Sequence, residues 1–220
     1  MPDTRLDVLA IGNAIVDVIA TASDEFLRAE GLPKGSMRLI DAEEASRLYS
    51  HMGAAREISG GSGANTVAGV AMLGGRAGFV GQVADDQLGE VFSHDIQATG
   101  VEFATRPMAG DVPTARCLIL VTPDAQRTMN TFLGAAQYLP PAALDEQQVR
   151  DAAILYLEGY LWDPAEPRAA MERAIEIAHG ASRKVAFTLS DAFVIERHRD
   201  GFNRLIAGGR STYCSPTRLR

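Results

Sequence analysis

The chain has 220 residues, 46% of them hydrophobic, so it can bury about 70% of the surface that its unfolded form exposes, and we expect one globular domain. Its formal net charge of -7 argues against the basic surface that nucleic acids or anionic membranes attract. With only two cysteines, Cys117 and Cys214, a disulfide framework and a cysteine zinc site are excluded, and a reducing compartment, the cytoplasm, is expected. Small-molecule partners are therefore favoured.

The first half of the chain alternates apolar runs with polar, glycine-rich turns. Residues 6–11 are predicted as a buried strand, and a second strand over residues 14–20 places Asn13 and Asp17 on one face by its two-residue period. An amide and a carboxylate so placed suit vicinal hydroxyls, although a half-exposed strand produces the same pattern. Further helices are predicted over residues 23–29, 41–52, 64–73 and 87–99, and further strands over 36–40 and 76–83.

The sequence pattern changes in the middle of the chain. Short β-like runs over residues 101–108, 114–121 and 127–132 are separated by Gly110, Pro113 and the Pro123-Asp124 turn, which predicts a small antiparallel sheet beside the main one. After residue 138 helices and strands alternate again, which predicts right-handed crossovers and a parallel sheet. These elements are helices over 142–150, 167–179 and 191–206, and strands over 153–158 and 184–189.

A glycine cluster precedes the helix at residues 64–73 and is the most constrained stretch of the chain. Gly61 and Gly63 with Asn65 either present free backbone amides to a polar ligand or form a tight turn without one. No Gly-Lys-Ser/Thr follows, so the cluster is not a Walker A loop. Thr66 stands where a dinucleotide fingerprint needs its third glycine, which argues against an oxidoreductase, a reading that NAD binding would revive.

Three further residues are candidates for ligand contact. Arg127 has a fork of donors that suits phosphate oxygens, although a lone arginine in a strand is more often solvated. Tyr160 and Trp162 follow the strand at 153–158, where parallel sheets bind ligands, and either stack on a base or cap the core. The four histidines have no metal-ligand spacing, so no metal site is expected.

Several segments together resemble one family. GNAIVD at residues 12–17, GGSGAN at 60–65 with LGG and FVGQVADDQLGE after it, and QRTMNTFLGA at 126–135 resemble the ribokinase-like sugar and nucleoside kinases, the PfkB family, over about residues 6–209. GGSGANT and the Arg127 segment are more similar to the adenosine-kinase-like branch. The resemblance implies an α/β fold, a three-layer α/β/α sandwich with a mostly parallel central sheet. It also implies a small β lid with strands near residues 13–20, 36–40 and 101–132.

The resemblance also implies a function, an ATP-dependent kinase with Mg²⁺ that phosphorylates the primary hydroxyl of an adenosine-like nucleoside or of a sugar. Ribose hydroxyls would be held by Asn13, Asp17, Gly61, Ser62 and Asn65. Arg127 would lie near the substrate or phosphate end, and Tyr160 near the base or the lid. The lid would also be the contact of a homodimer.

The family's D-T-x-G-A-G-D segment, which carries its general base, and its Asn-x-x-Glu motif do not occur in this sequence. No catalytic or metal-binding residue is therefore expected in this chain, and most of the ATP site is expected to be absent. The alternative function is a catalytically inactive truncated fragment, incomplete at its C-terminus, with residual substrate binding. We interpret residues 210–220 as an aberrant tail, because codons shifted by one base permit a strand running into Asn-x-x-Glu. Sequencing the gene through Arg210 tests this hypothesis of a single-base deletion.

Overall fold

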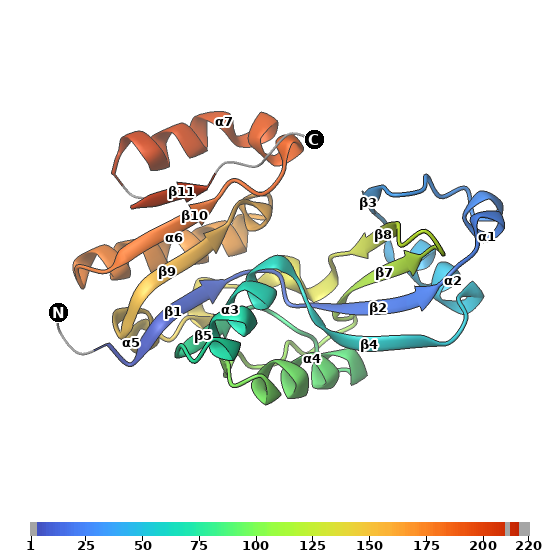
Figure 1. The fold of residues 1–220 in the computed structure, drawn as a ribbon. Helices are drawn as coiled ribbons and strands as arrows, with labels where there is room; N and C mark the ends of the chain where they lie inside the picture. Colours follow the sequence, from blue (N-terminus) through green and yellow to red (C-terminus); the bar gives the residue numbers. More distant parts are fainter. Residues whose placement is uncertain (1–3, 210–211, 216–220) are drawn as a thin grey trace.

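Two β-sheets organise the computed structural model, which describes residues 4–209 and 212–215 (Figure 1). The larger sheet has six strands in the order β11-β10-β9-β1-β5-β6, and its neighbouring strands pair in parallel. Its strands are β1 (Leu6–Ile11), β5 (Ala77–Val80), β6 (Glu102–Phe103), β9 (Ala152–Glu158), β10 (Lys184–Thr188) and β11 (Tyr213–Ser215). The expected parallel central sheet is confirmed.

The second sheet has five strands in the order β3-β8-β7-β2-β4. It is mixed and not antiparallel as expected, because β2 pairs with β7 in parallel and β3 with β8 in parallel. Long connections through the main body separate β2 from β7, and such connections permit parallel pairing. The strands are β2 (Ile15–Thr21), β3 (Met37–Leu39), β4 (Ala55–Gly60), β7 (Ala115–Val121) and β8 (Arg127–Phe132).

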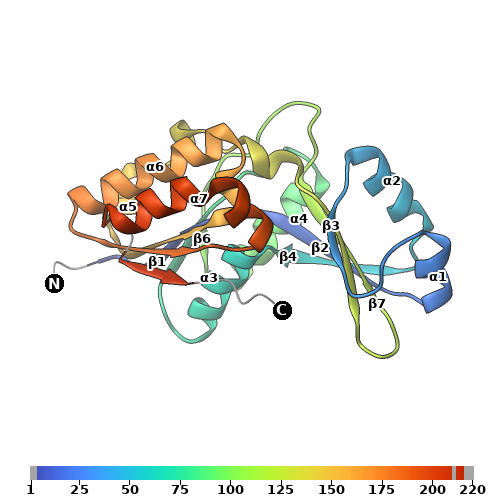
Figure 2. The same ribbon diagram turned by 90° about the horizontal axis from the view of Figure 1, so that it is seen from above.

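Helices cover both faces of the six-stranded sheet. Figure 2 shows α5, α6 and α7 on one face and α3 on the other, which is the three-layer α/β/α arrangement of a ribokinase-like fold. The helices are α1 (Asp24–Ala29), α2 (Ala42–His51), α3 (Ser62–Met72), α4 (Gln87–Ala98), α5 (Glu146–Arg150), α6 (Ala165–Gly180) and α7 (Ala192–Ala207). The short 3-10 turns are η1 (Gly134–Tyr138), η2 (Pro141–Ala143) and η3 (Gly159–Trp162).

Side-chain caps start three of these helices where the sequence predicted them. The Ser23 hydroxyl accepts a hydrogen bond from the Phe26 amide, and the carboxylates of Asp41 and Asp86 accept bonds from the Glu44 and Gly89 amides. Each cap satisfies a backbone donor that the first helical turn leaves free. Local chemistry therefore fixes these starts.

Two segments differ from the expected assignment. Residues 101–108 were expected among the lid strands, but β6 pairs with β5 at the edge of the six-stranded sheet. The Phe103 ring lies 5.3 Å from that of Phe92 and 6.0 Å from that of Phe79, so aromatic packing holds β6 to the main body. β4 was not predicted, because its sequence AREISG lacks an alternating apolar pattern, and it forms an edge of the second sheet.

Part of the predicted aberrant tail is ordered as a strand. Residues 213–215 pair in parallel with residues 186–188 of β10, although all three of their side chains are exposed. Backbone pairing at the sheet edge carries this contact. It is supplemented by the Lys184 ammonium, which donates to the Tyr213 hydroxyl and lies 5.5 Å from the centre of its ring. Residues 210, 211 and 216–220 lie outside the described residues. Within the described part of the chain, no helix is long and apolar enough to cross a membrane.

Candidate functional site

A cavity of about 290 Å³ lies between the second sheet, the start of α3 and the start of α7. The seven residues that the resemblance implied as substrate contacts all line it, although they come from four separate segments of the chain. These residues are Asn13, Asp17, Gly61, Ser62, Asn65, Arg127 and Tyr160. The fold therefore brings the whole predicted set to one place.

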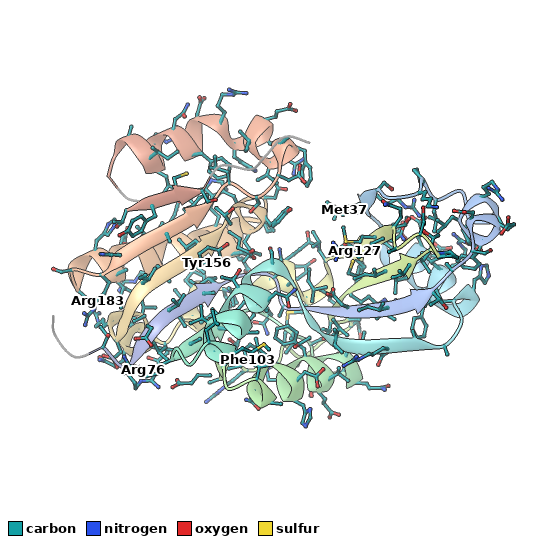
Figure 3. All side chains as sticks on the ribbon, viewed as in Figure 1. Met37, Arg76, Phe103, Arg127, Tyr156 and Arg183 are labelled. Atoms are coloured by element: carbon teal, nitrogen blue, oxygen red, sulfur yellow. The ribbon has the colours of Figure 1, made fainter. Side chains whose placement is uncertain are left out.

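The second sheet supplies one wall of the cavity through alternate residues of its strands. On β2, Asp17 faces the cavity while Val16 and Val18 are fully buried on the opposite face. The same alternation on β8 directs Arg127 and Met129 to the cavity. Figure 3 shows Arg127 with Met37 of β3 on the side of this sheet that faces the main body. The period-two argument made for β2 thus holds for the wall as a whole.

Asp17 lies against Gly60 of the neighbouring strand β4, whose lack of a side chain leaves room for the carboxylate. Burial raises the pKa of Asp17 to about 6, and the nearby positive charge of Arg127 opposes that rise. The carboxylate is therefore mainly ionised at neutral pH. An ionised carboxylate only accepts hydrogen bonds, so it suits ligand hydroxyl groups.

The glycine cluster forms the start of α3 and the polar end of the cavity. Gly61 has φ of 92°, and a β-carbon at this position would lie 2.4 Å from the Asn13 carbonyl oxygen. Only glycine fits such a conformation at so close an approach. The turn directs Ser62 and Asn65, both exposed, toward the cavity. The structure thus places the Asn65 amide and the acceptor lone pairs of the Ser62 hydroxyl at a helix N-terminus.

Glu158, at the end of β9, is a buried acid that the sequence argument missed. Its side chain is fully inaccessible and accepts a hydrogen bond from the Ser62 hydroxyl. Its Oε2 has no hydrogen-bond partner among the described residues, and it lies close to where β-carbons on Gly12 and Gly63 would be. Burial raises the pKa of Glu158 to about 7, while the Ser62 hydroxyl and the Gly63 and Asn13 amides oppose that rise. Glu158 therefore fixes the position of the Ser62 side chain through this hydrogen bond.

Tyr160 and α7 form the third wall. Tyr160 is half-buried, and Phe193 and Val194 from the first turn of α7 line the cavity opposite the second sheet. Trp162 instead packs in the core, with its ring 5.7 Å from those of Phe187 and Phe202. Of the two interpretations for the aromatics after β9, the cavity position applies to Tyr160 and the core position to Trp162.

Besides the buried Glu158, which does not itself line the cavity, sequence reasoning missed several residues that do. They are Ile15, Met37, Leu39, Cys117, Ile119, Met129, Thr131, Leu133, Asp163, Phe193 and Val194. Most are apolar residues of the second sheet, whose pattern alone does not separate a cavity wall from a core. For Glu158 the sequence did contain a signal. It is an acidic residue that ends the apolar run ILYLE, and the carboxyl end of a parallel strand is where ligands bind.

A protein-family comparison matches residues 7–208 to the pfkB family of carbohydrate kinases. The chain belongs to this family. The match covers the second sheet, the six-stranded sheet except β11 and the first residue of β1, and every residue of the cavity. It includes the glycine cluster. The fold is therefore that of the pfkB family, and the cavity lies within the matched residues.

Curated relatives in the family differ in substrate. The chain is 28% identical to the 5-dehydro-2-deoxygluconokinase of Shouchella clausii (strain KSM-K16) over 188 residues, 84% of this chain and 51% of the relative. It is 27% identical to the guanosine-inosine kinase of Escherichia coli (strain K12) over 198 residues, 86% of this chain and 46% of the relative. The chain thus spans about half the length of these relatives.

Two solved structures are more similar. An adenosine kinase from Sinorhizobium meliloti is 51% identical with a TM-score of 0.88, and a probable sugar kinase from Rhizobium etli CFN 42 is 49% identical with a TM-score of 0.89. In both cases the alignment covers 96% of this chain and 64% of the other. These structures share the PfkB fold with this chain. The names of the relatives include both nucleoside kinases and sugar kinases.

Proposed function

We propose that the cavity binds a nucleoside, adenosine or a close analogue, and that the activity served is ATP-dependent phosphorylation of its primary hydroxyl. The observation that carries the proposal is the meeting of all seven predicted contacts in one cavity. Its volume of about 290 Å³ is close to the lower end, roughly 300 Å³, of pockets that hold small organic ligands. One small polar ligand with a flat apolar part fits this description.

The polar end of the cavity suits the sugar. Asp17 accepts hydrogen bonds from two neighbouring hydroxyls, and the Asn13 and Asn65 amides both donate and accept. The Ser62 hydroxyl, held by Glu158, completes this end. These contacts would fix the ring so that its primary hydroxyl is the group left to react, which is the positioning that phosphoryl transfer requires.

The apolar end suits a base. Tyr160 and Phe193 offer aromatic rings, and Ile119, Met129 and Leu133 offer aliphatic surface. Aromatic rings stack on flat bases, and burial of apolar area adds to affinity. A sugar without a base would leave this end empty, which favours a nucleoside over the sugar alternative. The relatives named for adenosine and for guanosine and inosine support the same class.

Family membership implies ATP with Mg²⁺ as the phosphoryl donor. Among the described residues, no group of three or more His, Cys, Asp or Glu side chains could hold a metal ion. We assign no residue of this chain to Mg²⁺ or to ATP. Arg127, on the exposed rim of the cavity, is proposed to contact the substrate or its phosphate.

Calorimetric titration of the purified chain with adenosine, inosine and ribose tests the proposal, followed by a phosphoryl-transfer assay with ATP and Mg²⁺. We expect adenosine to bind more tightly than ribose. Asp17→Asn should lower the affinity for adenosine at least about tenfold, because a hydrogen bond to a charged group is lost. Binding without transfer would support the second candidate, a chain that binds substrate but does not phosphorylate it. No binding of any of the three ligands would overturn the proposal.

A homodimer through the second sheet is also proposed. β3 and β4 are the edge strands of this sheet, and in the described part of the chain the outer edge of each pairs with no further strand. Leu39 on β3 is 51% exposed. Edge strands offer backbone donors and acceptors to a second copy. Analytical ultracentrifugation measures the outcome, with a monomer at all concentrations as the contrary result.

A further inference from the structure

Asp163, directly after η3, lines the cavity with Tyr160 but directs its carboxylate to α7. The Arg197 guanidinium donates to both carboxylate oxygens, with Nε 3.1 Å from Oδ1 and Nη2 bonded to Oδ2. Nε2 of His198 lies 2.6 Å from Oδ1. Both oxygens are therefore occupied by one helix, and a single carboxylate joins η3 to α7.

The same stretch of α7 carries cavity residues. Phe193 and Val194 line the cavity, and the Arg197 guanidinium carbon lies 5.0 Å above the centre of the Phe193 ring. Arg197 thus contacts Asp163 with its donors and Phe193 with its face, a combination that a planar guanidinium permits. The position of Phe193 is tied to Asp163 through one side chain.

The backbone of α7 changes direction at this point. His198 has φ of -119° and ψ of 21°, outside the helical range, so residues 192–197 form a segment separated by a kink from the remainder of the helix. A short segment bounded by a kink has few helical bonds of its own and depends on its contacts for its position. The main polar contact is Asp163.

The charge state of Asp163 fits this role. Partial burial acts to raise the pKa of Asp163. Hydrogen bonds from Arg197 and His198 stabilise its carboxylate and outweigh burial, so the pKa lies below its ordinary value. Asp163 is therefore ionised at neutral pH and keeps both contacts. His198 is mostly enclosed, with 19% of its side chain exposed, and its ring lies 6.2 Å from that of Phe202 in the core.

We propose that Asp163 is a positioning residue that fixes the first segment of α7 against η3, and so sets the separation between Tyr160 and Phe193 that selects nucleosides over free sugars. This inference rests on the proposed function, because it assigns the base to these two rings. It concerns the apolar end of the cavity only. The sugar contacts of Asn13, Asp17 and Asn65 come from other elements and do not depend on Asp163.

The test compares Asp163→Asn with Glu146→Gln. Glu146 is a matched control, because its exposed carboxylate also pairs with two cationic side chains, Arg150 and Arg173, but lies outside the cavity. We expect Asp163→Asn to weaken adenosine binding about tenfold and ribose binding by less than about twofold. Glu146→Gln should leave both affinities within about twofold, and Asp163→Glu should recover part of the adenosine affinity.

Hydrogen exchange of the free protein supplies a readout that needs no ligand. Backbone amides of residues 192–197 should exchange faster in Asp163→Asn than in the wild type, and Glu146→Gln should leave them unchanged. Unchanged exchange, or equal losses of adenosine and ribose affinity, would overturn the proposal. A wild-type chain that binds ribose but no nucleoside would defeat both the proposed function and the selectivity assigned to Asp163. The exchange data would still show whether Asp163 fixes the first segment of α7.

Discussion

A β-carbon on Gly60 would lie 2.3 Å from Cγ of Asp17, across the antiparallel pair of β4 and β2. No conformation of a side chain at position 60 avoids that contact without moving the carboxylate, since real β-carbons do not approach other atoms so closely. The placement of the proposed sugar-binding acid therefore depends on a residue that contributes no functional group.

Gly60→Ala should displace Asp17 and weaken adenosine binding at least about tenfold, comparable to loss of a hydrogen bond to a charged group. Gly69→Ala is the matched control, because Gly69 lies within α3 with no atom within 4 Å of an added β-carbon. That control should keep its affinity and gain roughly 0.5–1 kcal/mol of stability. Titration calorimetry and denaturant melts measure the two effects. Equal affinity in Gly60→Ala and wild type would contradict the packing argument.

Adenosine affinity should rise between pH 5 and pH 7.5. The pKa of Asp17 is about 6, because burial outweighs the effect of Arg127, and only the ionised carboxylate accepts hydrogen bonds from two hydroxyls. Asp17→Asn, which cannot ionise, should show weak binding with little dependence on pH across this range. A wild-type affinity that is flat from pH 5 to 7.5 would exclude ionised Asp17 as the acceptor.

Glu158→Gln should change how stability depends on pH. The folded-state pKa of Glu158 is about 7, above its ordinary value of 4.5, because the side chain is buried. The folded state then binds the proton more tightly, so this stabilising contribution is complete below about pH 4.5 and is lost as pH rises through 7. Relative to wild type, Glu158→Gln should gain stability from pH 5 to pH 8, by up to roughly 3 kcal/mol. Urea melts at the two pH values check the difference, and a constant difference would refute it.

Phe92→Ala should destabilise the chain by about 3–5 kcal/mol, the usual cost of removing a buried aromatic ring. Phe92 is fully buried, and its ring lies 5.8 Å from that of Phe79 and 5.3 Å from that of Phe103. The loss removes the packing that holds β6 to the main sheet. Met72→Ala, at a position 80% exposed, should stay within about 0.5 kcal/mol of wild type in the same melts.

Local patterns in the sequence predicted what local chemistry determines. The span of β1, the caps at Ser23, Asp41 and Asp86, and the start of a helix at the glycine cluster follow from residues within a few positions of one another. The meeting of the seven cavity residues came from the family resemblance, because no spacing rule connects Asn13 with Arg127 or Tyr160.

What the sequence could not predict depends on contacts between distant segments. β4 has no alternating apolar pattern and β11 is exposed throughout, so both are strands only through their neighbours across a sheet. Glu158 is polar by type, yet it is buried because glycines at positions 12 and 63 leave space for it. Phe193 reaches the cavity only because α7 packs beside η3. Each miss involves tertiary structure overriding a local preference.

The chain passes between its two sheets beside Asn13 and again beside Gly61, so the polar end of the cavity adjoins two of the crossings. A small rotation of the second sheet about these crossings would move Asn13 least and the distal residues of β8, such as Arg127, most. The sugar contacts nearest the crossings would then persist while the apolar end widens. Such a rotation would let nucleosides that differ only in the bulk of their bases differ less in affinity than a rigid cavity of this size allows.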